Sequence, residues 1–206
     1  MSTSTIDFAT PPGGFSDAVE QSQQTFRAVL QALSTPGRVA TCAPMEEAPR
    51  GLGMAVAAAL LTLADLDTPV WIGPGFDAAA VGRWLQFHTG APLAAKPDVA
   101  AFVLLDARAA YPALEALAFG SDEAPEGGAT VLIQSETLDG PPAMQWRGPG
   151  IQDVVTVKGC GLDVAFWRAR QALEPYFPRG IDLLIGCGTA LLGCPRSTRI
   201  EFMAGN

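Results

Sequence analysis

Apolar residues along the chain first follow a helical pattern. Behind Asp17, which can cap a helix together with Glu20, they recur every three to four residues until Pro36-Gly37 stops the helix. The recurring positions are Val19, Phe26, Val29, Leu30 and Leu33. A second helix is expected from Leu52 to Ala64. That stretch is apolar on every side, so this helix must lie at the centre of the fold.

Shorter apolar runs bounded by turn residues predict strands. They are expected at 38–42, 69–72, 99–105, 129–134, 143–147, 154–157, 181–187, 190–194 and 199–203, with further helices near 77–87, 111–119 and 162–173. The run at 143–147 is expected to pair with the strand that precedes it. Alternation of strands and helices indicates an α/β fold, a three-layer sandwich around a mixed sheet with antiparallel edges. No repeat or long linker divides the sequence, so residues 1–206 are expected to form a single domain.

Charge is scarce for a chain of this size. Charged residues make up 17% of the sequence and apolar residues 49%, against about 25% charged residues in an ordinary globular domain. Either part of the surface is covered by a partner, or the proteome favours alanine, and the composition leaves both explanations open. The net charge of −8 argues against nucleic acid and against an anionic membrane as partners.

Other features of the sequence bear on its location. Residues Met1 to Pro12 lack the basic start and apolar core of a signal peptide, and the run from Leu52 to Ala64 is shorter than the roughly 20 residues that span a bilayer. The 4 cysteines form no C-x-x-C pair and there is 1 histidine, so no zinc site is expected. We expect a cytoplasmic protein with free thiols.

Three candidate residues surround the first helices. Asp65 and Asp67 follow the central apolar helix at the end where the helix dipole disfavours negative charge. An arginine partner, turn hydrogen bonds, or a ligand or interface role could compensate them. His88 ends the next helix, where it could serve in acid-base chemistry or be structural.

Four further candidates lie near the late strands. Arg179, Asp182, Arg196 and Arg199 concentrate guanidinium groups that suit phosphate or carboxylate recognition. Pairing between arginine and aspartate, or a subunit interface, would also explain them. The turns at 73–75 and 148–150 (Gly-Pro-Gly) could bring backbone close to an anion or be plain turns. No P-loop, G-x-S-x-G or H-E-x-x-H motif occurs, which argues against a self-contained hydrolase.

Several blocks in one order resemble the PhnH family, the H subunit of the bacterial carbon-phosphorus lyase core complex. They are Phe26-Arg27, Pro36-Gly37, 60–65 (LLTLAD), 67–71 (DTPVW), 87–93 (FHTGAPL), 127–130 (GGAT), 148–151 (GPGI), 178–183 (PRGIDL) and 195–198 (PRST). The blocks run from the first predicted helix to the last predicted strand.

The resemblance implies a fold, partners and a pathway. It implies a homodimer whose core is similar to the large domain of pyridoxal-phosphate-dependent transferases but carries no cofactor. A pyridoxal Schiff base needs a lysine amine, and the only lysines are Lys96 and Lys158, both expected outside helices and strands. The implied partners are the G, I and J subunits. With the L protein, the G, H and I proteins of the family displace adenine from ATP by a phosphonate, and the iron-sulfur subunit J cleaves the bond later.

Two hypotheses about function follow. In the first, the chain is an accessory subunit, without a catalytic residue of its own, that dimerises and binds the I-type partner. It would then assist formation of ribose 1-phosphonate 5-triphosphate. In the alternative, it is directly catalytic and lends Arg179, Arg196 or His88 to the transfer between nucleotide and phosphonate. A third, pyridoxal-dependent enzyme is disfavoured by the positions of the two lysines.

Overall fold

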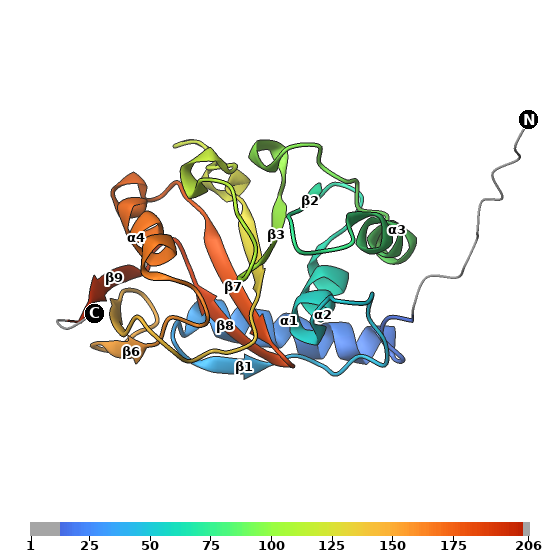
Figure 1. Ribbon diagram of the computed structural model, residues 1–206, viewed down its shortest axis with the longest axis horizontal. Coiled ribbons are helices and arrows are strands. Elements are labelled where there is room, and N and C mark those ends of the chain that lie inside the picture. Colours follow the sequence, from blue (N-terminus) through green and yellow to red (C-terminus); the bar gives the residue numbers. More distant parts are fainter. Residues whose placement is uncertain (1–12, 204–206) are drawn as a thin grey trace, which may run out of the picture.

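A computed structural model describes residues 13–203. The interpretation of Met1 to Pro12 as lacking a signal peptide lies outside this range. Of the three longest helices, the first runs along the lower edge of the molecule in Figure 1, the second lies above it and the third lies at the right. They are α1 (Ala18–Ser34), α2 (Met54–Leu63) and α3 (Ala78–Thr89), and all three were predicted. As the sequence required, α2 is central, because its residues from Ala55 to Leu60 are buried.

The main sheet has six strands in the order β1-β8-β7-β4-β3-β2. They are β1 (Val39–Thr41), β2 (Val70–Ile72), β3 (Phe102–Asp106), β4 (Thr130–Gln134), β7 (Asp182–Cys187) and β8 (Ala190–Cys194). Strands β2, β3, β4 and β7 are parallel, whereas β8 and β1 run antiparallel to their neighbours. The sheet is therefore mixed, as predicted, but only its β1 edge is antiparallel.

Residues along the central strands alternate between two cores. Leu104, Leu132 and Leu184 pack with α1, α2 and α3 on one face, while Val103, Val131 and Leu183 pack on the other. This second face is covered by α4 (Val164–Ala172) and by a separate antiparallel sheet. Both faces of the main sheet are therefore buried, which explains why its strands are continuous apolar runs rather than alternating ones.

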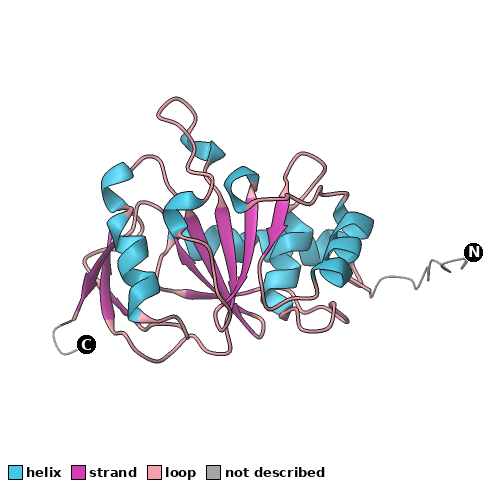
Figure 2. Cartoon of the chain, turned by 45° about the horizontal axis from the view of Figure 1, so that its top comes forward, coloured by secondary structure: helices cyan, strands magenta, loops and turns pink. Residues whose placement is uncertain are grey.

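The smaller sheet was not predicted. It has the order β6-β5-β9, with β5 (Met144–Arg147) between β6 (Val155–Val157) and β9 (Arg199–Phe202), and it lies at the edge of the molecule beside α4 (Figure 2). The expected pairing of 143–147 with the preceding strand is wrong. Strand β4 is already hydrogen-bonded on both sides, to β3 and to β7, so β5 has to pair elsewhere.

The helix expected at 111–119 is also wrong. Only Leu114–Ala116 forms a 3-10 turn, and the end of the segment is extended, because the carbonyl of Ala118 accepts a hydrogen bond from the Ala129 amide at 2.8 Å. Leu114 and Leu117 are the buried apolar side chains, and their spacing of three residues fits one 3-10 turn. Three more such turns occur at Pro97–Val99, Pro125–Gly127 and Glu174–Tyr176.

Candidate functional site

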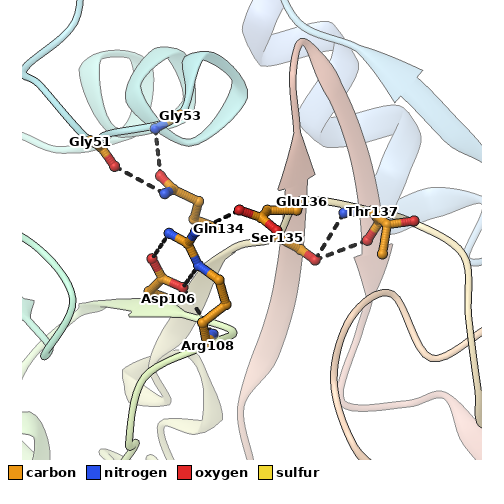
Figure 3. Close-up of polar contacts among 8 residues, drawn as sticks. All are labelled: Gly51, Gly53, Asp106, Arg108, Gln134, Ser135, Glu136 and Thr137. Carbon is orange, nitrogen blue, oxygen red and sulfur yellow. Dashed lines mark hydrogen bonds and ion pairs between the residues drawn. The ribbon is translucent and has the colours of Figure 1, made fainter.

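Two places in the molecule gather polar side chains between elements, and the second of them borders a cavity. The first is the carboxyl edge of the parallel strands, where ligands commonly bind in open α/β sheets. There the buried carboxylate of Asp106 ends β3 and receives two bonds from Arg108, Nε to Oδ1 at 3.0 Å and Nη2 to Oδ2 at 2.9 Å (Figure 3). Arg108 also pairs with Glu136. These bonds hold the pKa of Asp106 below its usual value, against the opposing effect of burial.

The same edge contains a contact between the end of β4 and the segment that leads into α2. Gln134 ends β4, accepts a hydrogen bond from the Gly53 amide and donates one to the Gly51 carbonyl at 3.0 Å (Figure 3). Its side chain thus binds the amide of Gly53, the N-cap residue of α2, while the Ala55 amide in the first turn donates to the Gly188 carbonyl. At the neighbouring Gly-Pro-Gly turn, a Cβ on Gly75 would lie 2.9 Å from the Asp106 Cβ, so a glycine is needed there for packing. The edge is held together by internal contacts.

The second place is a cavity of about 400 Å³ beside the small sheet. Its walls are formed by the end of β5 with the turn that follows, by Glu174 and Phe177, and by residues 196–199 and 201. Two of the predicted residues, Arg196 and Arg199, line this cavity.

Arg196 forms hydrogen bonds to other residues of the protein through its backbone amide and its guanidinium group. Its backbone amide donates to Asp182 Oδ1 at 2.7 Å, and its Nε and Nη2 reach Asp182 Oδ2 at 3.0 and 2.6 Å. The guanidinium also donates to the carbonyls of Pro125 and Gly128. The side chains of Arg196 and Asp182 are 15% and 22% exposed. Arg196 therefore fastens the 125–128 segment to the start of β7, which fits the structural alternative for this pair.

Arg179 points to a different partner. Its Nε lies 3.0 Å from the carboxylate of Asp122, and its guanidinium lies 5.9 Å from the ring of Tyr176. Arg179 is not among the residues that line the cavity. The four candidates near the late strands therefore do not form one site. They separate into an Arg196–Asp182 pair, an Arg179–Asp122 pair and Arg199.

Arg199 lies next to Arg147, which was not among the residues predicted from the sequence. Arg147 stands directly opposite Arg199 in the antiparallel pairing of β5 with β9, and both line the cavity. Arg147 has Glu201 at 3.9 Å and the Asp153 carbonyl at 3.4 Å. Within residues 13–203, Arg199 forms no ion pair. Alternation along the run MQWR, with Trp146 buried, was the available signal that Arg147 faces outward.

The remaining candidates lie at the opposite end of the molecule, where α3 is found (Figure 1). Asp65 Oδ1 accepts hydrogen bonds from the Asp67 amide and the Thr68 hydroxyl, each at 3.0 Å. Asp65 is thus compensated by turn hydrogen bonds, and Asp67 is exposed in the same turn. The exposed ring of His88 packs edge-on against Trp84 and Phe87, with centroids 5.4 and 5.0 Å apart. The structure does not bring these residues to the cavity.

Neither a metal cluster nor a membrane span is found in the described part of the chain. Across residues 13–203, no group of three or more histidine, cysteine or acidic side chains could hold a metal ion. Over the same range, every helix is too short or too polar to cross a bilayer. The cysteines are all free, and burial raises the pKa of the Cys160 thiol to about 12.

Comparison with known proteins identifies the family. A model of the bacterial phosphonate metabolism protein PhnH matches residues 13–201. The chain belongs to the PhnH family. One relative in Rhizobium meliloti (strain 1021) is 35% identical over 192 residues, which are 92% of this chain and 94% of the relative. It is named α-D-ribose 1-methylphosphonate 5-triphosphate synthase subunit PhnH. A putative C-P lyase subunit protein, HtxG of Stutzerimonas stutzeri, is 31% identical over 183 residues, 87% of this chain and 85% of the relative.

The match confirms the resemblance to PhnH seen in the sequence blocks, and the fold explains several of them. The block containing Gly128 packs against Arg196, since a Cβ on Gly128 would lie 2.8 Å from the guanidinium and 2.1 Å from the Gly180 carbonyl. In the 148–151 block, a Cβ on Gly150 would lie 2.0 Å from the Ser34 carbonyl. The 127–130, 178–183 and 195–198 blocks thus meet around the Arg196–Asp182 pair, and the 148–151 block packs against the end of α1; close packing requires glycine at both places.

Proposed function

We propose that this chain is an accessory subunit of a carbon-phosphorus lyase core complex in the catabolism of organic phosphonates. In this role it assists the formation of ribose 1-phosphonate 5-triphosphate from ATP and a phosphonate. The observation that carries the proposal is the family match along nearly the whole chain, together with two relatives whose names describe subunits of such systems. The proposed partners are a second copy of the chain and the G, I and J subunits, in the cytoplasm.

An exposed apolar stripe on α1 supports a role in assembly. Val19, Phe26 and Leu30 are 84%, 45% and 51% exposed. Their spacing of seven and four residues places them on one side of the helix, opposite the buried Ala28. An apolar helix stripe of this kind commonly marks a contact with another protein. The stripe is also one part of the surface where charged residues are missing.

Co-expression of the chain with the other core subunits, followed by size-exclusion chromatography, tests the proposal. We expect the chain to elute with the complex and, when expressed alone, as a dimer. The double variant Phe26→Ser/Leu30→Gln should weaken association, whereas Leu66→Gln, which changes a more exposed leucine in the turn after α2, should not. Elution of the unmodified chain as a separate monomer, with all partners present, would refute the assembly role.

The catalytic alternative has less support from the geometry. Arg196 is hydrogen-bonded to Asp182, Arg179 forms an exposed ion pair with Asp122, and His88 lies on α3 at the other end of the molecule. A reconstituted complex containing Arg196→Ala discriminates between the two roles. Unchanged turnover with an intact complex would remove Arg196 from the mechanism, and lost turnover with an intact, stable complex would favour direct participation.

We also propose that the described residues form one domain whose core is similar to the large domain of pyridoxal-phosphate-dependent transferases, without the cofactor. The support is a parallel array of four strands, β2-β3-β4-β7, buried between two layers. Lys96 and Lys158 are both exposed, and neither lines the 400 Å³ cavity. Neither lysine is therefore desolvated in the way that activates a Schiff-base amine. Borohydride trapping of pyridoxal phosphate on either lysine would overturn this proposal.

A further inference from the structure

The arrangement of two arginines beside the cavity is unfavourable in the absence of a ligand. Arg147 and Arg199 are cross-strand partners in β5 and β9, and like charges directly opposite each other destabilise a sheet. Their strand neighbours Trp146 and Ile200 are buried, so both arginines project from the outer face of the small sheet. Chains usually place unlike charges at such positions, and departures from local rules tend to occur at functional sites.

Of the carboxylates nearby, only Glu201 forms an ion pair with one of these two arginines, Arg147, and none does so with Arg199 in the part of the chain that the structure describes. Glu201 lies 3.9 Å from Arg147, beyond the distance of a charge-assisted hydrogen bond. Glu174 is directed at the backbone, since its Oε1 accepts the Ile200 amide at 2.7 Å. The third carboxylate, Asp182, is taken by Arg196. Arg199 is consequently left without an ionic partner among the described residues.

A neutral hydrogen-bond donor lies on the same wall. Ser197 lines the cavity, is half-buried, and its hydroxyl forms no hydrogen bond within residues 13–203. The turn at residues 148–150 passes close to Ser197. Gly148 makes this approach possible, because it has a φ of +141° and a Cβ there would lie 2.9 Å from the Ser197 carbonyl. Two guanidinium groups and a hydroxyl therefore border one hollow.

We infer that this cavity binds a phosphorus oxyanion through Arg147 and Arg199, with the Ser197 hydroxyl as an additional donor. Guanidinium groups bind phosphate-type oxygens in a bidentate manner, and a group with two negative charges matches two arginines. The volume of about 400 Å³ lies in the range of small-molecule sites and exceeds what one phosphoryl group needs. Phe177, which is 58% exposed, offers an apolar wall for an attached organic moiety.

Two arginines could bind a dicarboxylate as well as a phosphorus oxyanion. The preference for a phosphorus oxyanion rests on the proposed function, because that function involves phosphonates. Several sources of that chemistry exist, so the test has separate arms. Isothermal titration of the full chain, in a buffer of low ionic strength, would use inorganic phosphate, methylphosphonate, ATP and succinate. We expect phosphorus oxyanions to bind more tightly than succinate, and the arm with the highest affinity identifies the source.

Two variants and a control locate the site. Arg199→Gln and Arg147→Gln should each weaken binding by about tenfold or more, as loss of a charge-assisted contact requires. Arg179→Gln, which removes an arginine outside the cavity, should change affinity by less than about twofold. Because Arg199→Gln also removes the repulsion between like charges, the ligand-free variant should melt at the same or a slightly higher temperature, while losing the rise in Tm that ligand gives the unmodified chain.

Three outcomes would overturn the inference: no binding of any phosphorus oxyanion, equal binding of succinate, or unchanged affinity in Arg199→Gln. Each of them can occur while the chain still enters the core complex, in which case the assembly role survives and the anion site does not. Failure to enter the complex would refute the proposed function instead, whatever the titration gives.

Discussion

Replacing Arg196 with alanine tests how much of the fold depends on one partly buried ion pair. The substitution removes two side-chain bonds to Asp182 and the bonds to the carbonyls of Pro125 and Gly128. It keeps the bond from the backbone amide of residue 196 to Asp182. The main loss is therefore the tether between the 125–128 segment and β7, along with the counter-charge of a carboxylate that remains in place.

The expected magnitude follows from the exposure of the pair. Truncating one member of a fully buried pair costs about 3–5 kcal/mol, because the other charge remains without a partner, whereas exposed pairs contribute about 0–1 kcal/mol. Asp182 is 22% exposed, so water can reach part of its carboxylate. We therefore expect Arg196→Ala to lower the free energy of unfolding by about 2–3 kcal/mol. For a chain of this length, that corresponds to a fall in Tm of roughly 4–12 °C.

Urea unfolding followed by tryptophan fluorescence measures this loss, and Arg199→Gln provides the matched control. Arg199 forms no ion pair within the described range, so its replacement should change the free energy of unfolding by no more than about 0.5 kcal/mol. A loss below about 0.5 kcal/mol in Arg196→Ala, or equal losses in both variants, would show that the reasoning from burial is wrong.

Three further predictions concern other parts of the molecule. Gly150→Ala should lower the free energy of unfolding by about 1–3 kcal/mol more than Gly140→Ala, because both positions have positive φ but a Cβ meets atoms only at Gly150; equal losses in urea titrations would argue against the clash. Because Arg108 lowers the pKa of Asp106, their pairing stabilises the fold above the usual pKa of about 3.8 and loses this effect as the pH falls through the lowered value. Arg108→Met should therefore lose less stability between neutral and acidic pH than the unmodified chain, and parallel acid unfolding curves would contradict this. Finally, burial raises the pKa of three thiols to about 11 or 12, so a disulfide reagent at mildly alkaline pH should rapidly modify only the half-exposed Cys187, and fast reaction of a second thiol would disprove this.

The helices and most strands could be predicted because their signals are local. Helix α1 begins after Asp17, whose side chain accepts from the amides of Val19 and Glu20, and it ends before Pro36-Gly37. The partner in the cap was nevertheless misassigned: Gln21, and not Glu20, accepts the Asp17 amide at 2.8 Å. The apolar residues of this helix also do not all face the core, because Val29 is buried whereas Phe26 is half exposed. Spacing predicts a helix, but it does not tell which apolar face meets the core.

Strand pairing and the site depend on contacts between distant residues. The pairing of β5 with β9 joins positions about fifty residues apart in sequence, as in Arg147 and Arg199, and no local pattern encodes it. For that reason Arg199 was a candidate while Arg147 was overlooked. The same limitation applies to Asp106 and Gln134, whose only signal was a polar residue at the end of an apolar run.

The lengths of the outermost strands restrict how any partner can attach. Both lateral strands of the main sheet, β1 and β2, contain three residues, and those of the small sheet, β6 and β9, contain three and four. Extending either sheet with a foreign strand would add few backbone hydrogen bonds, and such short edges are a common protection against uncontrolled edge-to-edge pairing of sheets. Recognition between subunits must then rely on side-chain complementarity, which can be selective for particular companions in a way that backbone pairing cannot.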